Sequence, residues 1–211
     1  MSSTAQEHHP ERGMAHRYRW AIRLLIPLFL TSGATSLVYE TLWERQLHLV
    51  VGTSQVAVIV VLTAFMAGLA LGGFASARIA NRVRNPLMMY AVLEGIIGLY
   101  ALAFPYILDA IQPIYLSFWT AVEPGPIGFA VFQFFLTGLF VLPPTICMGA
   151  TLPILCRFAT QTMEESGAQV GRLYGANTIG AVLGVAIAGF YLLPNFGLQA
   201  TTMYTAGANL S

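Results

Sequence analysis

Residues 54–77 read SQVAVIVVLTAFMAGLALGGFASA, and no charged side chain interrupts them. The stretch exceeds the roughly 20 apolar residues that an α-helix needs to cross the hydrocarbon core of a bilayer. Its apolar residues do not alternate with polar ones, as the strands of a membrane barrel would require. The stretch therefore predicts a transmembrane helix, and similar runs elsewhere predict an all-α fold, a polytopic transmembrane helix bundle.

The composition is typical of a membrane protein. Hydrophobic residues make up 56% of the chain and charged residues 9%, whereas about a quarter of the residues in a soluble domain are charged. The formal net charge of +1 gives no basic footprint for nucleic acid. The chain also contains no lysine for Schiff-base or phosphate-loop chemistry. We therefore expect the lipid bilayer as a partner, and no nucleic acid.

The apolar runs predict about five complete spans and the start of a sixth. A polar cytoplasmic tail over residues 1–19 precedes a bundle formed by residues 20–211. The complete spans are expected at about residues 20–43, 54–77, 86–108, 127–158 and 173–193, with the sixth beginning near residue 200. The sequence stops about half a crossing into that helix, so we expect a further domain or the end of the helix beyond residue 211.

Arginines set the expected orientation. They gather before the first span and between the second and third, at Arg12, Arg17, Arg19 and Arg23 and at Arg78, Arg82 and Arg84. Cytoplasmic loops carry an excess of basic residues, so the N-terminus is expected in the cytoplasm, with the bundle in a bacterial cytoplasmic membrane. Residues 109–127 contain acidic and aromatic residues but no basic one, which predicts a short helix in the outer interface.

The fourth apolar run contains the sequence LPPTICMGATLP at residues 142–153. A proline inside a helix lacks a backbone donor and clashes with the preceding turn. We therefore expect the helix to break or kink at Pro143, Pro144, Gly149 and Pro153. Backbone groups that such a break frees need partners within the protein or a polar cavity.

Small residues mark two predicted faces where helices approach closely. The first lies on the second span and the other on the fifth, at Gly68 and Gly72 and at Gly175, Gly180 and Gly184. Glycines four residues apart let two helix backbones pack together. Plain helix packing is the first interpretation, and a moving, transporter-like interface is the alternative.

Glu94 is a candidate site because it lies within the third span, close to the expected membrane midplane. An ionisable group there must be neutral or paired. Gly95 and Gly98 beside it allow another helix to approach. Two roles stay open for Glu94, a structural hydrogen bond between helices and a site for a ligand or a proton.

An acidic stripe continues the first span. Glu40, Glu44 and His48 are spaced four residues apart and share one helix face, beside Tyr39 and Trp43. Carboxylates next to aromatic rings can hold an organic cation or a proton. The alternative is that Glu44 and Arg45 are ordinary interfacial groups and that Glu40 pairs with a base or a hydroxyl on a neighbouring helix.

The sequence offers no catalytic residue, no metal site and no cofactor site. Cys147 and Cys156 are nine positions apart on one predicted helix, which turns them to different faces, beyond disulfide reach. No further soft ligands gather near them, so we expect free thiols packed as small apolar groups.

Four blocks of the sequence resemble a known family. They read TSGATSLVYETLWERQLHLVVGTS, AFMAGLALGGFASARIANR, LPPTICMGATLPILCRFAT and GRLYGANTIGAVLGVAIAGFYLLPNFGLQAT, in this order from residue 31 to residue 201. Together they resemble the N-terminal multi-pass membrane domain of fused spermidine synthase-like proteins, which is distantly similar to half of a major facilitator transporter. In that family a cytoplasmic aminopropyltransferase domain follows the membrane domain.

The resemblance implies polyamine chemistry, but the family's catalytic half lies outside these residues. We therefore predict a membrane-embedded domain that is itself non-catalytic, an anchor or accessory subunit with protein partners in a membrane complex or a downstream cytoplasmic domain. One alternative is the membrane part of a polyamine aminopropyltransferase that binds or passes polyamine. Another is a secondary carrier of small organic cations, with its site at the proline-rich break.

Overall fold

A computed structural model describes residues 10–51, 55–122, 125–161 and 166–210. These residues form helices and short connections without a strand, which confirms the all-α fold class. The elements are α1 (Pro10–Val51), α2 (Gln55–Ile79), the 3₁₀ turn η1 (Ala80–Arg82), α3 (Pro86–Val122), α4 (Pro126–Gln161), α5 (Ser166–Ile187), the π-helical segment η2 (Ala188–Leu192) and α6 (Leu193–Leu210).

Five helical stretches are long and apolar enough to cross a membrane. They are Leu25–Leu49, Val58–Arg82, Pro86–Phe118, Ile127–Ala159 and Val170–Leu210. The last stretch covers α5, η2 and α6 together. These lengths and compositions are compatible with an integral membrane protein.

Two helices are longer than the apolar runs indicate. α1 already begins at Pro10, so the second half of the expected tail is helical, whereas residues 1–9 lie outside the described part of the chain. Proline is favoured at the first position of a helix because its missing N–H has no helical partner there. α3 continues to Val122, so the separate outer-interface helix expected at residues 109–127 is wrong.

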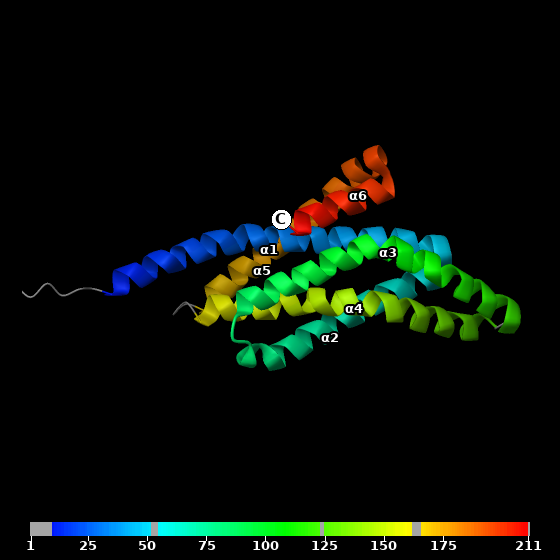
Figure 1. Ribbon diagram of the computed structural model, residues 1–211, viewed down its shortest axis with the longest axis horizontal. Helices are drawn as coiled ribbons and strands as arrows, with labels where there is room; N and C mark the ends of the chain where they lie inside the picture. The colour runs from blue at the N-terminus through cyan, green and yellow to red at the C-terminus, as the bar shows by residue number, and fades with distance from the viewer. Residues whose placement is uncertain (1–9, 52–54, 123–124, 162–165, 211) are drawn as a thin grey trace, which may run out of the picture.

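The long helices run back and forth along the long axis of an elongated bundle (Figure 1). In the figure α1 and α3 run from left to right, and α2 and α4 run from right to left. The most extensive packing joins α2 to α4 and α1 to α5. In both of these pairs the two helices run in the same direction.

Glycines bring the backbones of α2 and α4 together. A Cβ atom added to Gly72 would overlap the carbonyl of Ile146, and one added to Gly149 would overlap the carbonyl of Leu69. Gly68 packs in the same way against the side chain of Thr145. Only residues without a side chain let these two helices lie so close.

The pair formed by α1 and α5 uses the same device. Added Cβ atoms at Gly180 and Gly184 would overlap the carbonyls of Leu30 and Ala34. On the α1 side, Gly33 meets the backbone of Asn177. At Gly175, by contrast, an added Cβ would meet no atom of the other described helices within 4 Å.

The prolines of α4 do not interrupt the helix. Pro143, Pro144 and Pro153 all lie inside α4, which stays α-helical throughout, so the expected break is not confirmed. Pro144 cannot donate a hydrogen bond to the carbonyl of Phe140, four residues earlier. The hydroxyl of Tyr100 on α3 donates to that carbonyl instead, at 2.7 Å. A neighbouring helix thus supplies the partner that the proline removes.

Aromatic rings fill the core between α1 and α3. Tyr39 stacks on Trp43 with ring centroids 5.5 Å apart, and Trp43 contacts Phe104 with centroids 5.0 Å apart. All three side chains are almost completely buried. These contacts fix α1 against α3 and hold the residues nearby in place.

The chain reverses direction inside α6, at Gly197 within the sequence PNFGLQ. Gly197 has a φ of 74°, a conformation that glycine adopts without strain. The reversal sends α6 back toward α1 and α3, as Figure 1 shows at the upper right. Asn209, near the end of α6, reaches the centre of the bundle for this reason.

Candidate functional site

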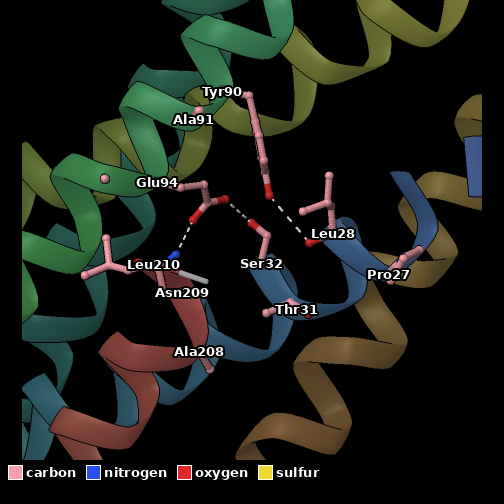
Figure 2. Close-up of a pocket in the computed structure, with 11 residues that line it drawn as sticks. Pro27, Leu28, Thr31, Ser32, Tyr90, Ala91, Glu94, Ala208, Asn209 and Leu210 are labelled. Atoms are coloured by element: carbon pink, nitrogen blue, oxygen red, sulfur yellow. Dashed lines mark hydrogen bonds between the residues drawn. The ribbon is translucent and has the colours of Figure 1, made fainter. Parts of the chain in front are cut away.

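Glu94 joins three helices through hydrogen bonds. Its side chain is buried on α3, with 7% of its surface exposed. The hydroxyl of Ser32 on α1 donates to Oε1 at 2.5 Å, and the side-chain amide of Asn209 on α6 donates to Oε2 at 2.5 Å. Figure 2 shows both donors pointing at the carboxylate. Each oxygen of Glu94 therefore has a donor from a different helix.

A glycine makes the approach of α6 possible. A Cβ atom at Gly98, one turn after Glu94, would lie 2.7 Å from Oδ1 of Asn209 and would also meet Leu210. Any larger residue would move the end of α6 away from Glu94. On the other side, Ser32 precedes Gly33, whose close contact with α5 fixes this part of α1.

A cavity of about 470 Å³ lies beside the Glu94 hydrogen bonds. Its walls are mainly apolar and include Pro27, Leu28, Ala91 and Leu210. The ring of Tyr90 also lines this cavity, and its hydroxyl donates to the carbonyl of Leu28 at 3.5 Å. Ser32 and Asn209 already donate to one oxygen each of the carboxylate, so a ligand here would have to share the carboxylate with both of them. The geometry favours a structural hydrogen bond between helices.

Glu40 lies in a different place. It is half-buried and lines a second cavity of about 380 Å³, enclosed by α1, α2, α4 and α5. Among the described residues, no side chain or backbone group donates a hydrogen bond to its carboxylate. This separates Glu40 from Glu94, which has two donors.

The structure thus divides the four residues predicted as a cation or proton site. Glu94 and Glu40 belong to two separate cavities, and Glu44 and His48 line neither of them. Glu44 is nevertheless close enough to Glu40 to act on it electrostatically. Nε2 of His48 is buried and has no hydrogen-bond partner among the residues that the structure describes.

Metal and thiol chemistry have no visible centre in the described part of the chain. No three side chains of His, Cys, Asp or Glu come together there as a metal site. Cys147 and Cys156 are both unpaired and half-buried. We therefore assign no metal site and no thiol chemistry to the described residues, and the candidate sites are the two cavities lined by Glu94 and Glu40.

Sequence reasoning missed the hydrogen-bond partners of Glu94 and the polar residues that line the Glu40 cavity. Ser32 and Asn209 lie 62 and 115 positions from Glu94, and Asn177 enters the Glu40 cavity from α5. The one available signal was their position beside glycines or in an apolar helix, where a polar side chain needs a partner. That signal does not say which helix supplies the partner.

The comparisons with known proteins give one distant similarity. No protein-family model and no solved structure matches the chain. The chain is 24% identical, over 185 residues, to polyamine aminopropyltransferase 1 from Streptomyces coelicolor. The alignment covers 86% of this chain but 31% of that protein, so the chain spans about a third of the relative's length. The similarity supports the resemblance to spermidine synthase-like proteins.

Proposed function

We propose that this chain is a helical membrane module of a polyamine aminopropyltransferase-like protein, which anchors and assembles the enzyme and does not itself catalyse. The observation that carries the proposal is the overlap of two features. The alignment to the aminopropyltransferase covers 86% of the chain, and the candidate spans occupy most of residues 25–210. The similarity must therefore include much of the apolar bundle.

The proposed module has five spans and a sixth that begins after the turn at Gly197. Its N-terminus lies in the cytoplasm, because Arg78, Arg82 and Arg84 lie around the connection between α2 and α3. A bacterial cytoplasmic membrane fits this arrangement. The hydrogen bonds at Glu94 then serve to lock α1, α3 and α6 together.

Aminopropyl transfer is assigned to another domain or to a partner subunit. Nucleotide-like cosubstrates bind at glycine-rich turns that follow a strand, whereas the glycines of this chain lie mostly inside apolar helices. The alternative that the bundle also binds polyamine has its own support, because the Glu40 carboxylate faces a cavity and has no hydrogen-bond donor among the described residues.

The experiment is purification of the native protein from its own membranes in mild detergent, with intact-mass measurement and identification of bound partners. The purified assembly is then assayed for aminopropyl transfer from decarboxylated S-adenosylmethionine to a diamine. We expect the protein to resist extraction by alkaline carbonate and the assembly to transfer the aminopropyl group. Release by carbonate, or a detergent-stable assembly without transferase activity, would overturn the proposal.

A further inference from the structure

The Glu40 cavity is lined by one carboxylate and by apolar side chains, a combination that suits an amine. Glu40 is the one ionisable side chain among the described residues that line it. Apolar side chains from α2 and α4, among them Phe65, Leu69 and Met148, form much of the remaining wall. A carboxylate in such surroundings is costly unless a positive partner or a proton neutralises it.

A proline leaves a second hydrogen-bond acceptor in the same wall. Pro153 has no N–H and cannot donate to the carbonyl of Gly149, four residues earlier in α4. Both residues line the cavity, and the freed oxygen of Gly149 lies 3.6 Å from the Cβ position of Gly73, another lining residue on α2. The proline thus leaves a backbone acceptor at the cavity wall.

Thr151 adds one more acceptor. Its hydroxyl donates to the carbonyl of Met148 at 2.7 Å, so its remaining capacity is to accept. The wall therefore combines the Glu40 carboxylate, the freed Gly149 carbonyl and the Thr151 oxygen. Ser36 and Asn177, which also line the cavity, can both donate and accept.

We propose that this cavity binds the primary ammonium group of an aliphatic amine, with Glu40 as its counter-ion. An ammonium group brings one positive charge and three N–H donors, and the cavity wall offers a carboxylate and two further acceptors. The attached methylene chain contacts the apolar walls. The identification of the amine as a polyamine rests on the function proposed above, whereas the ammonium chemistry rests on the cavity alone.

The size of the cavity favours an organic amine over a bare metal ion. A volume of about 380 Å³ falls within the range of sites for small organic ligands, roughly 300–1,000 Å³. A monatomic cation held by these oxygens would leave most of the cavity volume unfilled. Sodium is therefore the competitor to include in the test.

The test measures binding of radiolabelled spermidine and putrescine to the purified protein in lipid nanodiscs by equilibrium dialysis. Glu40→Gln keeps the shape of the side chain and removes the charge, and Glu44→Gln is the matched control one turn along the same helix. We expect Glu40→Gln to weaken binding about tenfold or more, and Glu44→Gln to change it less than about threefold. An excess of sodium chloride at constant ionic strength should not compete.

A second variant protects the test against misfolding. Thr151→Val keeps the shape of the side chain and removes one acceptor, and we expect it to weaken binding several-fold. Thermal unfolding and size-exclusion profiles must match the unmodified protein before binding is compared. Equal binding by Glu40→Gln and the unmodified protein, equal losses for Glu40→Gln and Glu44→Gln, or no amine binding by the folded protein would each overturn the proposal.

The result separates this inference from the proposed function. Amine binding that depends on Glu40, in a protein whose native assembly lacks transferase activity, would keep the ammonium site and reject the aminopropyltransferase assignment. Transferase activity of the native assembly without binding that depends on Glu40 would do the reverse.

Discussion

Asn209 donates a hydrogen bond to Glu94 at 2.5 Å across 115 positions of the chain, and so ties the end of α6 to the first third of α3. Ser32 completes the arrangement from α1, also at 2.5 Å. The polar centre of the bundle thus depends on helices from both ends of the described chain. Substitutions of Glu94 can show whether these hydrogen bonds stabilise the bundle through hydrogen bonding alone or also need the negative charge of the carboxylate.

Replacement of Glu94 by glutamine should be tolerated, and replacement by leucine should not. A glutamine keeps an acceptor, and Asn209 can turn its amide to accept from the new NH₂ group. Leucine removes the acceptor of the Ser32 hydroxyl and of Nδ2 of Asn209, which should lower the free energy of unfolding by about 1–2 kcal/mol. Unfolding of the detergent-solubilised variants by denaturant measures the difference. Equal destabilisation by both variants would show that the negative charge itself is required.

The Tyr100 hydroxyl and Pro144 should be energetically coupled through the carbonyl of Phe140. Tyr100→Phe keeps the ring and leaves that carbonyl without its donor, so we expect a loss of about 1–3 kcal/mol in unfolding free energy. Pro144→Ala restores a backbone N–H to the helix. In the Pro144→Ala background the loss caused by Tyr100→Phe should therefore be smaller, which a double-mutant cycle measures. Additive losses would show that Tyr100 does not replace the missing backbone donor.

Alanine at Gly72 and alanine at Gly175 should have different effects. The Cβ at position 72 would overlap the Ile146 carbonyl and force α2 away from α4, at a cost of about 1–3 kcal/mol. At position 175 the added Cβ meets no atom of the other described helices within 4 Å, and alanine is the better helix former. Thermal unfolding of both variants in the same detergent tests this contrast. Similar midpoints for the two would contradict the close packing of α2 on α4.

The proposed orientation can be tested by labelling single cysteines. With Cys147 and Cys156 replaced by alanine, we place a new cysteine at exposed Asn81 in one variant and at exposed Thr120 in another. In intact spheroplasts a membrane-impermeant maleimide should label position 120 and leave position 81 unlabelled. Disruption of the membrane should expose position 81. Labelling of position 81 from the outside would reverse the orientation.

The sequence predicted where the helices lie better than it predicted where they end and which helices contact one another. Apolar runs predicted helices in the regions of the candidate stretches because hydrocarbon thickness dictates helix length, but the last stretch joins the predicted fifth span and the start of the sixth. The ends were less certain, since α1 and α3 continue beyond their apolar parts. Proline patterns predicted a break in α4, but α4 is continuous, and Tyr100 of another helix donates to the carbonyl that Pro144 leaves without a partner.

For the candidate sites too, the sequence predicted the residues but not their surroundings. Glu94 was predicted to need a partner because charge is expensive within the bilayer. Its partners could not be named, because one periodic pattern does not say which helix faces which. Likewise, the spacing of Glu40, Glu44 and His48 predicted one shared face. It could not show that only Glu40 of the three lines one of the two cavities.

The long separation between Glu94 and Asn209 has a consequence for biosynthesis. A ribosome adds roughly 5–20 residues per second, so α3 leaves the ribosome many seconds before Asn209 is made. During that interval Ser32 is the one of the two donors already present. Until α6 is made, Glu94 therefore has one of its two hydrogen bonds unmade, and the arrival of α6 supplies the second.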